Sequence, residues 1–445
     1  MKNVYSLLVI LCFSTTAFSQ ATGELFRILS DEYSALIVRN DLMKSAKKEM
    51  LLCTFIIEGD NIGYHNLKLI VDATQRGVQV KMILDGLGKK VPIKMLLYLK
   101  DLGVQIKIYN KINWKRPFMI YRRLHGKMLV LDGQYCLIGG RNLHDGYYRM
   151  DSLSNFLDRE VVIRSDKAVH EARQHFNELW KHEVICTDLE GAFNPADRKQ
   201  CQLLLDSSSL VVNSYIPLLR KVKGADMVSL SDVVKSTANQ VQFVYPDFTY
   251  IKKSGRISRY NRIDRRITDT LQALVASADS TVDLESPYFL LTRSWLKCLK
   301  KAQKKGVRIR VITNSVTSTD VPIMQAIYAN RRRSYQRAGI QLYEYCGVRT
   351  VHFKTLTIDK QVVIIGSYNL DKSSEKYNTE VAAWVKDTLL ALQQQKLFEK
   401  YLLLCMPPGG ECPTSLSVLN KEQKKRKRKV KWLRFTLAPL LGLIL

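Results

Sequence analysis

Two stretches of this sequence place a histidine, a lysine, an aspartate and an asparagine at the same spacing. LHGKMLVLDGQYCLIGGRN spans residues 124–142, and VHFKTLTIDKQVVIIGSYN spans residues 351–369. The matching residues keep a constant offset of 227 positions, as from 125 to 352 and from 142 to 369. A buried strand normally reads as an apolar run, and an unpaired charge inside one is costly. These polar positions therefore require a chemical explanation.

The residue types suit attack on a phosphodiester. Such a reaction needs a nucleophile at phosphorus, an acid for the leaving oxygen, and donors for the charged equatorial oxygens. Histidine suits the first two roles because its unperturbed pKa lies near neutrality. His125 and His352, one from each copy, can fill both roles. The groups expected to surround the phosphoryl group, without a metal or other cofactor, are Lys127, Lys354, Asn142 and Asn369.

The copies extend beyond the motifs, which indicates a duplicated domain. Two further pairs of segments correspond. They are QRGVQVKMILDG at 75–86 with KKGVRIRVITNS at 304–315, and LGVQIKIYN at 102–110 with AGIQLYEYC at 338–346. Within each motif the residues between the polar members are apolar, as in a strand, so that histidine and lysine point to the same face. A shared pocket follows if the two strands meet across a domain interface.

The elements that position these motifs alternate between helical and strand patterns. Helical stretches such as 35–49 and 293–306 alternate with short β-branched runs at 78–84 and 307–313, each introduced by a glycine. This alternation predicts two α/β domains with largely parallel sheets covered by helices, at about residues 30–185 and 240–405. The polar stretch between them, residues 186–239, is interpreted as a linker or insertion with some helix.

The arrangement HxKxxxxD followed by GGxN or GSxN resembles the phospholipase D superfamily at both copies. Two further segments are similar to bacterial cardiolipin synthases, ESPYFLLT at 285–292 and GGRNLHDGYY at 139–148. The resemblance covers most of the chain, from about residue 30 to about residue 400. It implies two homologous α/β/α sandwich domains with the active site at their interface.

The resemblance also implies roles for single residues. One histidine forms a phosphohistidine intermediate, and the other acts first as acid and then as base. His125 is the expected nucleophile by the usual order in the family, although the sequence itself does not distinguish it from His352. An acidic residue after each motif is expected to orient a histidine, and Glu380 and Asp158 match those positions.

The remaining signature positions are expected to be structural. Asp132 and Asp359 belong to the motif, and we expect them to be salt-bridge partners that do not touch phosphate. The other structural positions of the motif are Gly139, Gly140, Gly366 and Ser367.

The composition favours an anionic partner. The chain has 69 Lys and Arg residues against 41 Asp and Glu, which gives a formal net charge of +28. Such an excess attracts nucleic acid or anionic lipid, and charge alone does not choose between them because both present phosphate. An apolar content of 46% is ordinary for a globular protein and argues against wholesale disorder.

The N-terminus resembles a secretory signal. Residues 1–19 combine a lysine, an apolar run over residues 4–13 and small residues before Gln20. That run is too short to span a bilayer, which takes roughly 20 residues, although an uncleaved anchor is the alternative. We therefore expect export to the bacterial periplasm or cell envelope.

Export would permit disulfides among the remaining cysteines. The pairs closest in sequence are Cys405 with Cys412 and Cys186 with Cys201, and these are the candidates. Cys53 and Cys136 lie in apolar runs and are expected to be core residues.

The C-terminal tail, residues 421–445, combines charge with apolar residues. Seven Lys or Arg residues between 424 and 431 precede Trp432 and an apolar run that contains Pro439. This pattern is short for a spanning helix and favours peripheral attachment to an anionic membrane surface. A basic tail that contacts nucleic acid is the alternative.

Together these features predict a cardiolipin synthase-like phosphatidyltransferase or phospholipase D that acts on glycerophospholipids. The alternative is a secreted phosphodiesterase or nuclease, for which alone nucleic acid is an expected partner. A descendant that only binds is disfavoured because both copies retain His, Lys and Asn. The expected partners are a phospholipid substrate and an anionic membrane surface, and we expect a monomer without an obligatory protein partner.

Overall fold

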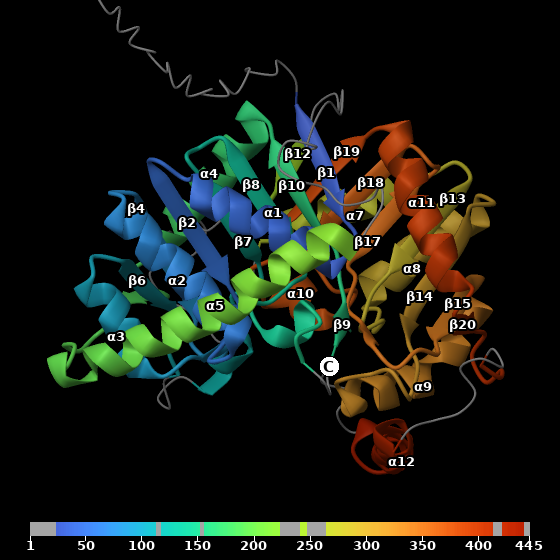
Figure 1. The fold of residues 1–445 in the computed structure, drawn as a ribbon. Coiled ribbons are helices and arrows are strands. Elements are labelled where there is room, and N and C mark those ends of the chain that lie inside the picture. Colours follow the sequence, from blue (N-terminus) through green and yellow to red (C-terminus); the bar gives the residue numbers. More distant parts are fainter. Residues whose placement is uncertain are drawn as a thin grey trace, which may run out of the picture.

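The computed structural model describes residues 24–112, 117–151, 155–222, 241–246, 264–412 and 421–439. The expected signal segment lies outside these ranges. Two eight-stranded sheets, one from each copy of the repeat, form the framework (Figure 1).

The first sheet contains, in spatial order, β1 (Leu25–Leu29), β10 (Glu160–Arg164), β8 (Tyr135–Gly139), β7 (Lys127–Leu131), β2 (Glu49–Thr54), β4 (Gln79–Asp85), β6 (Gln105–Tyr109) and β11 (Cys186–Asp188). The second contains β12 (Gln242–Val244), β19 (Ala382–Lys386), β18 (Val362–Gly366), β17 (Thr355–Ile358), β13 (Thr281–Glu285), β14 (Arg308–Asn314), β15 (Ile340–Tyr345) and β20 (Cys405–Met406). The strand order is thus the same in both halves.

Both sheets are mixed, so the expectation of largely parallel sheets is wrong. Parallel pairing is confined to β2–β4–β6 in the first sheet and β13–β14–β15 in the second. The strand that begins with the motif lysine, β7, instead turns tightly into β8, with Asp132 and Gly133 at positive φ in the turn. Helix–strand alternation predicts parallel pairing only where a helix connects the strands, and no helix separates β7 from β8.

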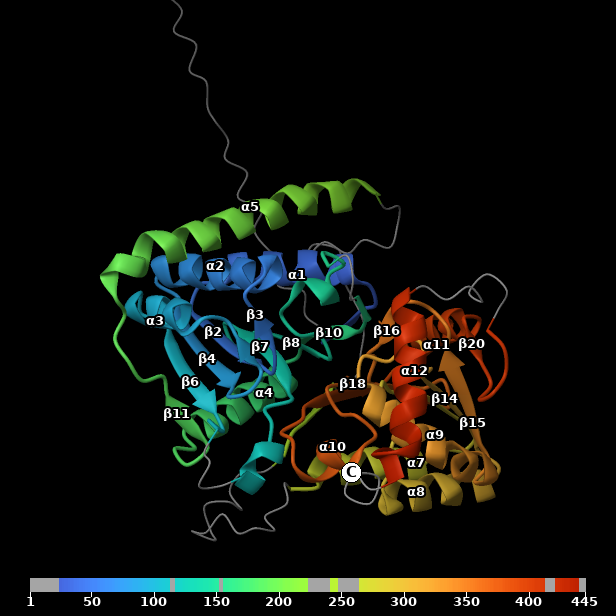
Figure 2. The same ribbon diagram turned by 90° about the horizontal axis from the view of Figure 1, so that it is seen from below.

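Helices cover both faces of each sheet, which confirms the expected α/β/α sandwiches (Figure 2). The outer face of the first sheet carries α1 (Glu32–Ser45), α2 (Asn61–Gln75), α3 (Ile93–Asp101) and α5 (Arg198–Val222). The outer face of the second carries α7 (Arg266–Ala276), α8 (Arg293–Lys304), α9 (Pro322–Arg337) and α12 (Lys421–Phe435). The remaining helices are α4 (Asp166–Trp180), α10 (Lys372–Lys376) and α11 (Thr388–Leu402).

One apolar cluster joins the two halves. Alternate residues of the first sheet, such as Met128 and Val130 of β7, pack with Val363 and Ile365 of β18 and with side chains from α4 and α11. Cys53 and Cys136 belong to this cluster, as expected for core residues. Because the interface between the sheets is a continuous core, each half is fixed relative to the other.

The segment between the halves supplies α5, which runs over α1 and α2 (Figures 1 and 2). Its buried side chains recur at helical spacing and join the core of the first half. They include Cys201, Leu205, Val212 and Ile216. At least this part of the 186–239 stretch is an added outer helix of the first half.

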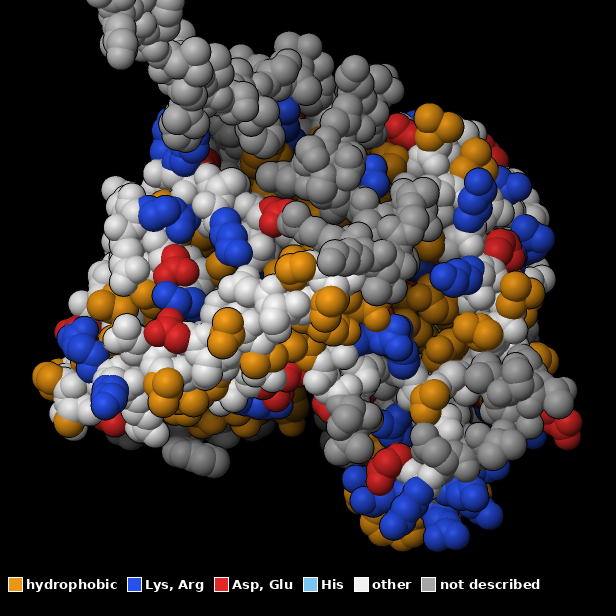
Figure 3. Space-filling view, viewed as in Figure 1, with side chains coloured by type: hydrophobic (Ala, Val, Ile, Leu, Met, Phe, Trp, Pro, Cys, Tyr) orange, Lys and Arg blue, Asp and Glu red, His pale blue; other side chains and the backbone are white. Residues whose placement is uncertain are grey.

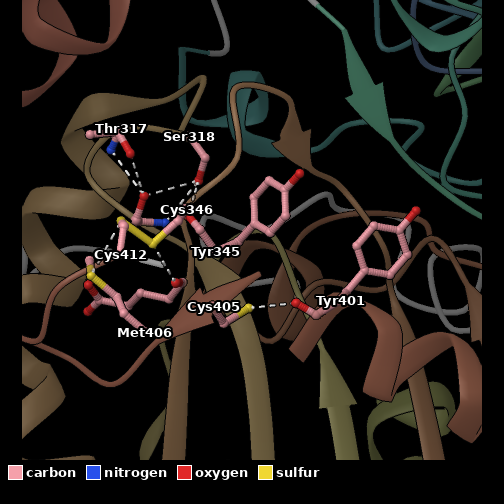
Figure 4. The surroundings of a disulfide bond; sticks show 10 residues. Thr317, Ser318, Tyr345, Cys346, Tyr401, Cys405, Met406 and Cys412 are labelled. Carbon is pink, nitrogen blue, oxygen red and sulfur yellow. Dashed lines mark hydrogen bonds between the residues drawn. A yellow bond between two sulfur atoms is a disulfide. The ribbon is translucent and has the colours of Figure 1, made fainter. Parts of the chain in front are cut away.

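The disulfide differs from both expected pairs. Cys346, which follows β15, is bonded to Cys412, and their Cα atoms lie 5.7 Å apart (Figure 4). Cys405, one of the expected partners, instead donates its thiol to the Tyr401 carbonyl at 3.1 Å. Cys186 and Cys201 are both free thiols. The bond ties the segment that leads to the C-terminal tail to the second sheet.

The basic tail forms a docked helix. Val430 and Leu433 of α12 are buried against α9 in the core of the second half, and Arg434 donates to the Asn330 side chain at 2.9 Å. No helix in the described part of the chain is long and apolar enough to cross a membrane.

Candidate active site

The two HxK segments enter their sheets at equivalent places. His125 lies just before β7, which begins at Lys127, and His352 and Lys354 lie just before β17. All four residues are buried, with between 3% and 8% of their surface exposed. The short strands β9 (Phe156–Leu157) and β16 (Thr350–Val351) pair in parallel between the halves and bring the second segment to the first.

His125 is held by the second half through both backbone and side chain. Its N–H donates to the Thr379 carbonyl at 3.0 Å, and its Nδ1 lies 2.9 and 3.0 Å from the two carboxylate oxygens of Glu380. A carbonyl and the carboxylate of the next residue therefore fix the ring from across the interface.

His352 is held by the first half in the same way. Its N–H donates to the Leu157 carbonyl at 2.7 Å, and its Nδ1 lies 2.6 Å from Oδ2 of Asp158. In both rings the carboxylate occupies Nδ1, which leaves Nε2 to face a substrate. The structure thus brings together the two histidines and the two orienting acids that the sequence predicts. Each histidine is oriented by the acid from the other half of the chain.

The two carboxylates lie in different surroundings. Burial opposes the ionisation of Glu380, but the charge and hydrogen bond of His125 outweigh it and hold the pKa of Glu380 below its usual range. Ser367 also donates to Glu380, at 2.5 Å. Burial raises the pKa of Asp158, although the cation of Lys354 acts in the opposite direction. Burial also lowers the pKa of both histidines, and the charge of Lys354 adds to this at His352.

The two lysines reach the same relative position. Lys127 Nζ donates to the His125 carbonyl at 2.7 Å, and Lys354 Nζ donates to the His352 carbonyl at 2.5 Å. Burial, together with the charge of Lys354, lowers the pKa of Lys127 to about 7, and burial lowers that of Lys354 to about 8. Two buried ammonium groups that destabilise each other favour the binding of an anion between them.

The asparagines and glycines occupy the remaining positions of the two motifs. Asn142 and Asn369 are buried, and the Asn369 side-chain oxygen has no hydrogen-bond partner in the described part of the chain. A Cβ added at Gly140 would lie 2.4 Å from the Asp158 carboxylate oxygens. The equivalent position of the second half is Ser367, whose hydroxyl binds Glu380. Glycine therefore makes room for the carboxylate in one half, where serine donates to it in the other.

Gly139 and Gly366 end the second strand of each motif hairpin. A Cβ at Gly139 would lie 2.4 Å from the Arg159 carbonyl oxygen, and one at Gly366 would lie 2.3 Å from the Val381 carbonyl oxygen. Since these carbonyls follow or neighbour the orienting acids, glycine is needed for the close approach of the two chain segments.

Within the described ranges, the motif aspartates bind backbone amides and form none of the expected salt bridges. Asp132 accepts backbone N–H groups of residues 47–49 at 2.7 to 3.2 Å, and Asp359 accepts those of residues 279–281 at 2.8 Å. Each carboxylate therefore fixes the entry of the neighbouring strand, β2 or β13. These contacts agree with the structural role expected for Asp132 and Asp359. The partners are backbone amides, because the entry of each strand leaves three N–H groups without a partner in the sheet.

Sequence reasoning missed several residues that contact the site. The Tyr147 hydroxyl lies 3.1 Å from His352 Nδ1, and Tyr288 stands edge-on to the same ring. Asp320 accepts a hydrogen bond from the Tyr288 hydroxyl at 2.8 Å. Ser374 donates to Glu380 at 2.7 Å. Tyr147 and Ser374 occupy the same repeat position but differ in type, so comparison of the two copies does not reveal them.

Two sandwiches that share one buried site, built from a duplicated HxK and asparagine motif, define an enzyme of the phospholipase D class. The family model described as cardiolipin synthase, PLD-like domain, matches residues 40–180 and 271–402, and this chain belongs to that family. The predicted superfamily and its cardiolipin synthase-like branch are therefore confirmed.

Curated relatives that carry the name of that enzyme match most of this chain. Cardiolipin synthase C of Escherichia coli (strain K12) is 25% identical over 403 residues, which cover 83% of this chain and 83% of that protein. Cardiolipin synthase 1 of Staphylococcus aureus (strain COL) is 24% identical over 361 residues, 80% of this chain and 63% of that protein.

A solved structure confirms the paired fold. The phosphatidylserine synthase of Haemophilus influenzae Rd KW20 superposes with a TM-score of 0.64 at 16% identity, over 95% of each chain. At this identity the likeness concerns the fold alone.

Proposed function

We propose that this protein is a phosphatidyltransferase that exchanges one alcohol on a phosphatidyl group for another, as its cardiolipin synthase relatives are named to do. The observation that carries the proposal is the single buried site to which each half contributes a histidine, a lysine and an orienting acid. The relatives that match most of the chain are named as phospholipid enzymes, so the secreted nuclease is not favoured.

In the first step, Nε2 of neutral His125 attacks phosphorus while Glu380 holds the proton on Nδ1. The N–P bond forms as the bond from phosphorus to the headgroup oxygen breaks. Protonated His352 gives its Nε2 proton to that oxygen, and the headgroup leaves as an alcohol. Lys127 and Lys354 offset the negative charge on the equatorial oxygens, which the buried setting makes more effective.

In the second step, neutral His352 accepts the proton of the incoming alcohol. The alcohol oxygen attacks phosphorus, the N–P bond breaks, and the free imidazole of His125 is restored. Water in place of the alcohol gives phosphatidic acid by the same proton transfers. No step of this cycle draws on a group other than the side chains of the site.

The test is turnover of defined substrates by the full chain in the presence of a chelator. Phosphatidylglycerol vesicles are expected to yield cardiolipin and glycerol, and phosphatidic acid where water competes. Single-stranded and duplex DNA serve as the comparison substrates and are expected to stay intact. DNA cleavage without lipid turnover would replace the lipid function by a nuclease, and lipid turnover that the chelator stops would contradict the metal-free chemistry.

We also propose that the protein is exported and works at the surface of an anionic membrane through α12. The buried side of this helix faces α9, whereas its cationic residues project outward, and Figure 3 shows Lys and Arg gathered over it. Trp432, Phe435 and Leu437 are exposed at its C-terminal end, at 61%, 73% and 44%. Outward cations next to exposed apolar side chains match a charged bilayer surface.

Charge reversal on α12 tests the membrane contact without removing its buried anchors. Replacing Lys424, Lys427, Arg428 and Lys431 by glutamate is expected to weaken binding to phosphatidylglycerol vesicles at least about tenfold at low salt. The loss should shrink at high salt because screening already removes part of the attraction. Vesicle co-sedimentation measures both.

The matched control replaces four exposed lysines of α8, so that the net charge changes equally. These residues are Lys297, Lys300, Lys301 and Lys304. An equal loss of binding in both variants would show that net charge alone, and not α12, attracts the vesicle.

A further inference from the structure

A tyrosine and an aspartate that the proposed mechanism does not use lie beside His352. Tyr288, in the ESPYFLLT segment, follows β13 and stands edge-on to the His352 ring, with centroids 6.5 Å apart. Its hydroxyl donates to the carboxylate of Asp320, whose two oxygens lie 2.8 and 3.0 Å away. Asp320 lies in the connection from β14 to α9, just before that helix begins at Pro322. The pair therefore extends the site outward from His352.

Asp320 is the exposed member of the acidic groups that act on a motif lysine. Burial lowers the pKa of Lys354, and the charges of four carboxylates oppose this effect: Asp158, Glu380, Asp320 and Asp371. The other three are buried, with between 1% and 4% of their surface exposed. A carboxylate that acts on Lys354 and is also open to solvent stands where the buried site meets the surface, and a bound substrate can reach it.

The pair lies on the side of the site where the alcohol is exchanged. In the proposed mechanism, His352 protonates the leaving oxygen and later deprotonates the incoming alcohol. The attacking and leaving atoms lie roughly in line at phosphorus, so the exchanged oxygen is on the side opposite His125. The rest of the headgroup extends from that oxygen. Asp320 is an exposed acceptor on this side, held by the ring that stands beside His352.

The first half has no acidic residue at the corresponding position. The sequence VPI occurs at residues 91–93 and again at 321–323, so the residue that corresponds to Asp320 is Lys90. Lys90 is exposed and pairs with Glu58 at 2.5 Å. The repeat thus presents an acceptor at this position in the second half and a donor in the first, which distinguishes the two sides of an otherwise symmetric site.

Nearby cations make this carboxylate suited to neutral donors. Burial raises the pKa of Asp320, and the hydrogen bond from Tyr288 lowers it. The charges of Lys354 and Arg426 lower it further. Arg426 belongs to α12 and donates to the Thr317 carbonyl at 3.4 Å. A carboxylate has about four acceptor sites, of which Tyr288 uses part. Because two cations already offset its charge, the remaining sites favour hydroxyl groups over a further cation.

We propose that Asp320, positioned by Tyr288, selects the exchanged alcohol by accepting a hydrogen bond from a second hydroxyl group of that alcohol. The proposal rests on the proposed function and deepens it, because it assigns the headgroup to the polyols, of which glycerol is one. A simple alcohol such as methanol uses its single hydroxyl at phosphorus and has none left for Asp320. Asp320 thus determines specificity, and the proton transfers remain with the histidines.

The test is a competition between two alcohols for the same phosphatidyl group on the full chain. The donor is phosphatidyl-p-nitrophenol in vesicles, with glycerol and methanol at equal concentrations. Mass spectrometry measures the ratio of phosphatidylglycerol to phosphatidylmethanol, which does not depend on the amount of active protein. Asp320→Leu is expected to lower this ratio about tenfold, since a hydrogen bond to a charged group is lost.

Two further variants grade the effect. Asp320→Asn should lower the ratio less than Asp320→Leu, because the amide oxygen still accepts a hydrogen bond but carries no charge. Tyr288→Phe keeps the ring beside His352 and removes the donor that holds the carboxylate, so the ratio should fall in the same direction.

Asp279→Leu is the matched control. Asp279 is an exposed aspartate of the same half, and it precedes β13 whereas Tyr288 follows that strand. The ratio should keep the parent value in this variant. An unchanged ratio in Asp320→Leu, or an equal fall in Asp279→Leu, would overturn the proposal.

A parent chain that releases no p-nitrophenol would refute the proposed function instead. Binding of glycerophosphoglycerol to the full chain, measured by calorimetry, tests the selection without turnover. Asp320→Leu should weaken this binding about tenfold. Equal binding by the parent and the variant would overturn the proposal.

Discussion

Replacing either His125 or His352 by alanine is expected to reduce phosphatidyl transfer by at least about 10³-fold. One change removes the nucleophile, and the other removes the group that protonates the leaving alcohol and deprotonates the incoming one. The two losses should not multiply in the double variant, because both residues act in the same step. Release of glycerol from phosphatidylglycerol vesicles measures the rate, and the melting temperature checks that each variant is folded.

The two variants differ in what they can trap. With a phosphatidyl donor whose leaving group needs no proton, His352→Ala retains the nucleophile and should accumulate a covalent adduct on His125. Mass spectrometry of the intact chain near neutral pH detects the added phosphatidyl mass. His125→Ala should form no adduct. An adduct on His352 in the His125→Ala variant would reverse the two roles, and turnover at the normal rate in either variant would reject the two-histidine mechanism.

The repeat is itself a geometric constraint on where the candidate site residues can lie. His125 and His352 stand at a constant offset just before equivalent strands, and both histidines, both motif lysines and both asparagines are buried. The offset does not reveal which half supplies the carboxylate for which histidine. That exchange depends on the β9–β16 pairing and on the Thr379 carbonyl, which are contacts across the interface and leave no local signal.

The wrong predictions, for the disulfide and for the partner of Asp132, have the same cause. Each partner is close in the folded structure but is not marked by closeness in sequence. Cys405 and Cys412 are neighbours in sequence, yet Cys346 is the residue whose Cα lies 5.7 Å from that of Cys412, a usual separation for a disulfide. Likewise, the motif predicts a salt-bridge partner for Asp132, whereas the strand entry beside it offers unpaired N–H groups. In both cases the partner is fixed by tertiary packing, which residue type and spacing do not encode.

The exchanged carboxylates lead to the second large effect. Glu380→Gln and Asp158→Asn are each expected to lower kcat by roughly 10²- to 10⁴-fold while the protein stays folded. The amide cannot stabilise an imidazolium, and its NH₂ group can leave the histidine in the wrong tautomer, with Nε2 protonated and unable to attack phosphorus. Glu380→Gln should act on the step assigned to His125 and therefore suppress adduct formation in the His352→Ala background.

Glu375 offers a matched control on the same segment. It is a buried carboxylate bound to Arg265 and Ser294, and it makes no contact with a histidine in the described part of the chain. Glu375→Gln should lower the melting temperature but leave kcat within about threefold of the parent, since the loss of a buried ion pair acts on folding. If Glu380→Gln and Glu375→Gln lowered kcat equally, the effect of Glu380 would be structural. Its position at His125 Nδ1 would then not be what supports the reaction.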